Sequence, residues 1–248
     1  MRHVALVGLI GLASFALLCP LRAEEAAKPA AAAVAKPAMV APADWGSQPK
    51  PIGDEHKHTP KFVTIHHGGT KWKTGKDPAA FVRAVQKYGQ DQKNWPDLPY
   101  HFMIAPDGRI FEARSMEYEP ESNTKYDLKG HIGVELMGNF EVERPSDAQL
   151  KSTVALVAWL CQDLNIAPSQ IGGHKDRAEG QTSCPGRDFY RYLQDGEFIG
   201  WVNETLEGKT PEVEAGEPLP GGPTTPIDTT VTTQPAATDK KAETPSKK

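Results

Sequence analysis

The 248-residue sequence has little cysteine, no strong excess of charge and a modest share of hydrophobic residues. Three cysteines are too few for a disulfide-dense scaffold. The formal net charge of -4 provides no basic surface, which argues against a nucleic-acid-binding protein. Only 38% of the residues are hydrophobic, while 22 are proline and 22 are glycine, so we expect part of the chain to stay unfolded.

Long hydrophobic runs are also missing, apart from one near the N-terminus. The apolar run from Val4 to Cys19 is shorter than the roughly 20 residues of a transmembrane helix. A charged start, this short run and the sequence Leu21-Arg22-Ala23 predict a cleaved signal peptide over residues 1–23. We therefore expect an exported protein, periplasmic or extracellular, with no stable membrane span after cleavage. A membrane anchor is the alternative interpretation.

Composition divides the remainder into one domain between two flexible segments. Residues 24–59 are rich in alanine and proline and predict a linker. Residues 208–248 are rich in threonine and proline, with almost no large apolar side chain, and predict a disordered tail. Residues 60–207 have the length of one ordinary domain.

Strand and helix patterns alternate within this domain. We predict strands at 62–67, 100–104, 109–111 and 132–137. Asp77 is expected to cap one helix, and Ser146 with Gln149 forms a capping box for a second. Shorter helices are expected near residues 189–193 and 198–206. The alternation predicts a mixed α/β layer fold.

A few side chains stand out as possible metal ligands: His66, His67, His174 and Cys184. Imidazole and thiolate are ligands that zinc prefers, and three protein ligands with one open position form the catalytic arrangement. His66 and His67 lie on opposite faces of a strand, so only one of them reaches a shared site, and alternation does not say which. For each of these residues a structural role is the alternative, because no local zinc motif is present.

Glu135 is unusual because it lies between apolar residues in a predicted strand. A carboxylate there is costly unless it is paired, functional or on a solvated face. Near a metal it could accept a proton. Tyr100 could point its hydroxyl into a cleft or simply pack as an aromatic ring. Cys161 lies on the apolar face of a helix and is assigned to the core.

Taken together, these segments resemble the zinc-dependent N-acetylmuramoyl-L-alanine amidases of the amidase type 2 family, whose superfamily includes the peptidoglycan recognition proteins. The motifs follow one another in order over residues 60–200, which makes the match far more specific than any one motif. They are Thr64-Ile65-His66-His67-Gly68-Gly69-Thr70, Leu98-Pro99-Tyr100-His101-Phe102-Met103-Ile104 with Asp107-Gly108, His131-Ile132-Gly133-Val134-Glu135-Leu136, Gly173-His174-Lys175-Asp176-Arg177 and Thr182-Ser183-Cys184-Pro185-Gly186.

The resemblance implies a single mixed β-sheet flanked by helices, with a zinc cleft on one face. It also implies the ligands, since the first histidine of the pair binds the metal in such proteins. His66, His174 and Cys184 would then hold Zn2+.

The resemblance further implies that Glu135 is the catalytic glutamate and that Tyr100 lies at the mouth of the cleft. Thr182 stands where some relatives have lysine, so its hydrogen bond to an oxyanion should be weaker. The implied reaction is hydrolysis of the amide between N-acetylmuramic acid and L-alanine in peptidoglycan or muropeptides, by a protein expected to be a monomer. The alternatives are a non-catalytic peptidoglycan-binding module and a peptidase that cuts within the peptide.

Overall fold

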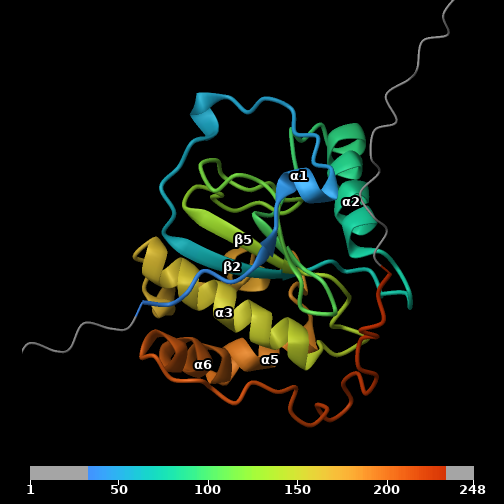
Figure 1. The fold of residues 1–248 in the computed structure, drawn as a ribbon, viewed down its shortest axis with the longest axis vertical. Helices are drawn as coiled ribbons and strands as arrows, with labels where there is room; N and C mark the ends of the chain where they lie inside the picture. The colour runs from blue at the N-terminus through green and yellow to red at the C-terminus, as the bar shows by residue number, and fades with distance from the viewer. Residues whose placement is uncertain (1–32, 233–248) are drawn as a thin grey trace, which may run out of the picture. The chain divides into compact units, whose positions relative to one another are not determined.

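The computed structural model describes residues 33–232 of the chain (Figure 1). The predicted signal peptide and the last sixteen residues of the predicted tail, 233–248, lie outside the described residues. Within the described part, six strands form one mixed sheet in the order β1-β4-β3-β5-β2-β6. All neighbouring strands are parallel except the β3–β4 hairpin. The strands are β1 Met39–Val40, β2 Phe62–His67, β3 Phe102–Ile104, β4 Ile110–Glu112, β5 His131–Leu136 and β6 Ile171–Gly173.

The predicted helices begin at the expected capping residues. The Asp77 carboxylate accepts hydrogen bonds from the backbone N–H groups of Ala79 and Ala80, and Ser146 with Gln149 forms the capping box. The helices are α1 Pro42–Trp45, α2 Pro78–Gln92, α3 Asp147–Asp163, α4 His174–Arg177, α5 Arg187–Gln194 and α6 Glu197–Leu206. In the described part of the chain, no helix has the length and apolar character that a membrane span requires.

Alternation along β2 and β5 gives the centre of the sheet two different faces. These strands pair in register, so His66 lies beside Glu135 and the two side chains share one face. The other face carries the aliphatic side chains of both strands, and α3 covers it with α5 and α6 on the same side (Figure 1). The predicted α/β fold is thereby confirmed, and Cys161 on α3 is buried in the core as expected.

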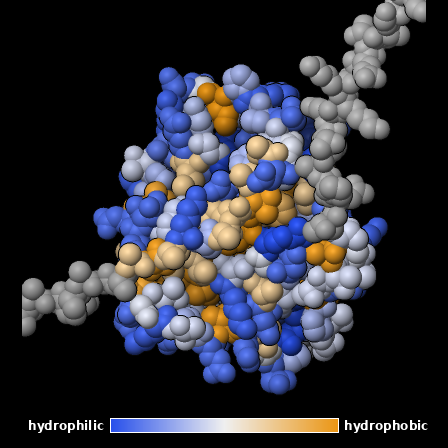
Figure 2. All heavy atoms as spheres, in the orientation of Figure 1, coloured by the Kyte–Doolittle hydropathy of each residue, from blue (hydrophilic) through white to orange (hydrophobic). Residues whose placement is uncertain are grey.

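The structure differs from the expected boundaries at the N-terminal side of the domain. Residues 33–59, where composition predicts a linker, supply β1 and α1. Trp45 is fully buried, and its indole N–H donates to the Glu112 carbonyl at 2.7 Å. Figure 2 shows hydrophobic surface gathered over this segment. A segment with few large side chains is ordered here because those few side chains are buried and its backbone extends the sheet.

Residues 208–232, which composition predicts to be disordered, also pack against the domain. Val213 and Ile227 are buried, and Ile227 forms backbone hydrogen bonds around Arg144 together with Thr225. Figure 1 shows this segment, in red, passing below α3 and rising beside the loop that precedes α2. The Thr230 carbonyl accepts a hydrogen bond from the backbone N–H of Gly75 at 3.0 Å. The folded domain therefore extends well beyond residues 60–207.

Candidate metal centre

Three of the predicted ligands come together at the end of β2. His66 is the fifth residue of that strand, and β6 pairs with β2 in parallel. His174 follows β6 directly as the first residue of α4, so the sheet places it near His66. Cys184 lies in the loop between α4 and α5, where its carbonyl accepts a hydrogen bond from the Lys175 backbone at 2.8 Å. Residues separated by more than one hundred positions thus meet through strand pairing and one loop contact.

The geometry of the three side chains fits one metal ion. A ligand atom from each of His66, His174 and Cys184 lies within 4.8 Å of the other two. Cys184 Sγ is 3.7 Å from His66 Nδ1. Tetrahedral zinc with bonds of about 2.0–2.3 Å requires ligand atoms roughly 3.3–3.7 Å apart. The donor set of two imidazoles and one thiol is also the chemistry that zinc selects.

Burial sets the protonation state of these ligands. His66, His174 and Cys184 are 3%, 8% and 7% exposed. Desolvation lowers the pKa of His66 well below its usual value and that of His174 to about 4, so both imidazoles are neutral. Burial raises the pKa of the Cys184 thiol to about 12. A divalent cation at these atoms would supply the positive charge that a buried thiolate lacks.

The structure distinguishes the two neighbouring histidines. His66 faces the other ligands, whereas the His67 side chain lies on the opposite face of β2, where its Nδ1 accepts a hydrogen bond from the Phe140 backbone at 3.1 Å. The His67 backbone N–H donates to Cys184 Sγ at 3.4 Å. His67 therefore contributes through its main chain, which supports negative charge on the sulfur atom.

Two residues that the sequence patterns did not reveal orient His174. Its Nε2 hydrogen-bonds Thr124 Oγ1 at 2.6 Å and lies 3.4 Å from Ser122 Oγ. This contact leaves Nδ1 as the ring nitrogen available to a metal. Ser122 and Thr124 belong to an irregular loop after β4 that carries no periodic pattern, so no signal in the sequence pointed to them.

Glu135 is buried beside the ligands without a hydrogen-bond partner. It is fully buried, and neither carboxylate oxygen has a partner among the described residues. Desolvation raises its pKa to about 8. A Cβ atom at Gly68 would lie 2.5 Å from Glu135 Oε1, so the absence of a side chain at Gly68 gives this carboxylate its room. A solvated strand face is thus excluded for Glu135.

Tyr100 and Thr182 line the cavity that contains the three ligands. This cavity has a volume of about 360 Å³. The Tyr100 ring centroid is 5.0 Å from that of His66, and burial raises the pKa of its hydroxyl well above the usual value. The Thr182 hydroxyl accepts a hydrogen bond from the Cys184 backbone N–H at 3.1 Å and keeps its own hydrogen to donate. The two hydroxyls therefore border the space beside the ligands.

A second cavity of about 480 Å³ adjoins the first. The two share Trp95, Pro99, Tyr100 and Asn123 in their linings. The second cavity is lined by Glu135 and by side chains of α2, including Phe81, Val85 and Tyr88. Together the two cavities form a cleft with the ligands in one part and a largely apolar wall in the other.

Comparison with known proteins gives a consistent result. The family model described as N-acetylmuramoyl-L-alanine amidase matches residues 56–187, more than half of the chain. Peptidoglycan-recognition protein LB of Drosophila melanogaster is 27% identical over 177 residues, which cover 69% of this chain and 74% of that protein. An N-acetylmuramoyl-L-alanine amidase of Sus scrofa is 28% identical over 166 residues, covering 60% of this chain and 26% of that protein.

Solved structures share the fold. Drosophila peptidoglycan recognition protein LB aligns with a TM-score of 0.56 and 25% identity, over 63% of this chain and 92% of that one. The amidase LysC from Clostridium intestinale aligns with a TM-score of 0.53 and 23% identity, over 68% of this chain and 99% of that one. Because the family model covers more than half of the chain, including the positions of His66, His174 and Cys184 and strands β2 to β6, this chain belongs to the N-acetylmuramoyl-L-alanine amidase family, amidase type 2.

Proposed function

We propose that this protein is a zinc-dependent amidase that hydrolyses the amide bond between N-acetylmuramic acid and L-alanine in peptidoglycan or its fragments. The observation that carries the proposal is the convergence of His66, His174 and Cys184 within 4.8 Å, in a chain of this family. A fold alone would not imply activity, because folds host many functions. The complete ligand set beside a buried, unpartnered glutamate supports an enzyme.

His66, His174 and Cys184 would hold the zinc ion, and Thr124 would fix the orientation of His174. When bound, zinc supplies Lewis acidity and an acidified water at an open coordination position. A substrate carbonyl in the cleft would lie beside Tyr100 and Thr182, which line the same cavity as the three side chains that would hold the zinc.

Glu135 is the proposed proton acceptor and donor. It takes a proton from the attacking water, and the water oxygen bonds to the carbonyl carbon of the lactyl amide. When the C–N bond breaks, Glu135 returns that proton to the leaving amine of L-alanine. Burial raises the pKa of Glu135, which helps the group to hold a proton between the two steps, and a cation beside it would favour the carboxylate form that accepts the proton.

Tyr100 and Thr182 are the proposed hydrogen-bond donors to the carbonyl oxygen as negative charge develops on it. Each bond is worth about 1–3 kcal/mol when well placed. Thr182 carries no charge, so its contribution belongs at the lower end of this range. The Cys184 hydrogen bond already fixes the Thr182 hydroxyl, which reduces the reorganisation needed during the reaction.

The test is mass spectrometry of purified sacculi after incubation with the full chain, with and without a chelator. We expect peptides with a free L-alanine amino terminus, and no release in the chelator. Glu135→Ala should keep zinc and lose most turnover, whereas His174→Ala should lose both. Near-normal turnover by Glu135→Ala would remove this residue from the mechanism.

A non-catalytic recognition module is the second candidate, because several relatives are named recognition proteins. That function predicts retention of the protein on sacculi with every amide bond intact, even when zinc is bound. A cut within the peptide would instead indicate a peptidase.

We also propose export, on the basis of the signal-like residues 1–23. Export brings the enzyme to a substrate that lies outside the inner membrane. N-terminal sequencing of the mature protein should begin at Glu24, and an intact Met1 would contradict cleavage.

A further inference from the structure

Lys76 is an unusual side chain in the apolar part of the cleft. Of the described residues that line either cavity, it is the one lysine or arginine. Its Nζ lies 4.3 Å from the centroid of the Phe81 ring and 5.5 Å from that of Trp72. Two aromatic rings therefore hold this cation at the cavity wall.

No acidic side chain neutralises Lys76. Among residues 33–232 its ammonium group forms no ion pair, although Lys36, Lys57 and Lys87 each pair with a carboxylate. Lys76 is half-buried, and its burial together with the nearby Lys73 lowers its pKa. A half-buried cation without a counter-ion in a ligand cavity is suited to bind an anion.

The loop that carries Lys76 is held in place from two sides. On one side, the Trp72 backbone N–H donates to the buried carboxylate of Glu143 at 2.9 Å. On the other, the C-terminal segment contacts Gly75 through Thr230, and the Thr74 hydroxyl donates to Asp228 at 2.6 Å. Lys76 is thus presented by an ordered loop, and little ordering is left for a ligand to impose.

The chemistry of the substrate identifies the anion. This step rests on the proposed amidase function. N-acetylated sugars are neutral, and the lactyl carboxyl is consumed in the scissile amide, so the negative charge lies on the peptide. The wall of Phe81, Val85 and Tyr88 also offers few hydrogen-bonding groups for a sugar. We propose that Lys76 binds a carboxylate of the substrate peptide and makes the protein select peptides with that carboxylate free.

The experiment uses the full zinc-loaded chain and N-acetylmuramoyl-peptides of one sequence, prepared with each carboxylate either free or as the primary amide. For one of these carboxylates we expect the amidated peptide to have a KM about tenfold higher than the free peptide, and a kcat within about twofold of it. The reason is that Lys76 would contact the carboxylate equally in the ground state and in the transition state. Lys76→Gln should abolish this difference, and Lys76→Arg should retain it.

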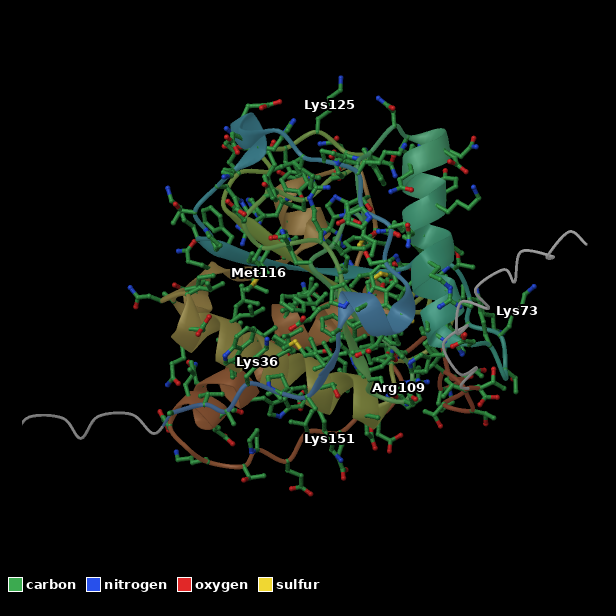
Figure 3. The ribbon with its side chains drawn as sticks, turned by 45° about the horizontal axis from the view of Figure 1, so that its top comes forward. Lys36, Lys73, Arg109, Met116, Lys125 and Lys151 are labelled. Carbon is green, nitrogen blue, oxygen red and sulfur yellow. The ribbon has the colours of Figure 1, made fainter. Side chains whose placement is uncertain are left out.

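Lys73→Gln is the matched control, because Lys73 is exposed, lies three residues away and projects outward beside the start of α2 (Figure 3). It should keep the tenfold preference. Equal KM values for free and amidated peptides in the wild-type protein, or an unchanged preference in Lys76→Gln, would overturn the proposal.

Calorimetric titration with the product peptide separates this proposal from the proposed reaction, because no turnover is required. A Lys76-dependent preference in binding without hydrolysis would uphold the role of Lys76 and refute the amidase function. Hydrolysis without any preference would refute the role of Lys76 alone.

Discussion

Replacing Gly68 by alanine tests whether the position of the Glu135 carboxylate matters. The added Cβ would lie 2.5 Å from Glu135 Oε1 and 3.5 Å from the Gly138 backbone, which is an ordinary contact. The Gly68 backbone is not in the left-handed region, so alanine introduces no strain of its own. The clash is therefore directed almost entirely at the proposed proton acceptor.

The size of the effect follows from that contact. Ordinary contacts begin near 3.4 Å, so the carboxylate must retreat by about 0.9 Å. A displacement of about 1 Å at a reacting group costs on the order of 100-fold in rate. Overpacking at this buried position also costs about 1–3 kcal/mol of stability. We expect kcat to fall roughly 30–100-fold, while zinc binding at His66, His174 and Cys184 is preserved.

The assay is kcat on a muropeptide, with zinc content and urea unfolding measured on the same preparations. Gly200→Ala is the control, since a Cβ there meets no atom within 4 Å and alanine favours the α6 helix. This variant should keep full activity. Gly68→Ala with zinc bound and kcat within threefold of wild type would refute the proposed use of Glu135.

Three further predictions concern the surroundings of the site and the enlarged domain. Thr124→Val removes the hydrogen bond to His174, a proposed zinc ligand, and should weaken zinc affinity about 10–100-fold in a chelator competition, so an unchanged affinity would contradict an orienting role. Trp45→Ala should cost about 3–5 kcal/mol in urea unfolding, and a loss below about 1 kcal/mol would show that residues 33–59 do not share the core. His101 is 1% exposed and accepts a hydrogen bond from the Gly133 N–H, and burial lowers its pKa to about 3. In the unfolded chain this imidazole gains a proton near pH 6.5, whereas in the folded protein it stays neutral down to about pH 3. The free energy of unfolding should therefore be highest above pH 6.5 and about 2 kcal/mol lower at pH 5 on account of His101. His101→Gln should flatten the pH dependence of unfolding accordingly, and an unchanged slope would exclude this origin.

The sequence by itself determined the family and most of the secondary structure of the central domain, although β6 and α4 were not among the predicted elements. The β-branched and apolar runs of β2 and β5, the carboxylate cap at Asp77 and the capping box at Ser146 are local features, and local sterics and hydrogen bonds suffice to produce them. The co-linear motifs around His66, His174 and Cys184 likewise identified the family without any knowledge of distances.

Composition was a poor guide to the ends of the domain. Composition is an average over a whole segment. Whether residues 33–59 and 208–232 adopt a defined structure depends instead on a few individual side chains. Trp45 and Ile227 are buried among residues far away in the sequence, so the composition of their own segment does not predict how much they stabilise the fold.

Only the tertiary structure decided which groups share the cleft. The parallel register of β2 and β5 places Glu135 beside His66, and the turn from β6 into α4 brings in His174. Thr124 and Lys76 lie in loops without a periodic pattern. Their neighbours, His174 and the Phe81 ring, can be identified only from the packed structure. Ligand convergence, burial and the missing counter-ion of Lys76 are properties of distances between residues remote in the chain, and a linear pattern does not encode those distances.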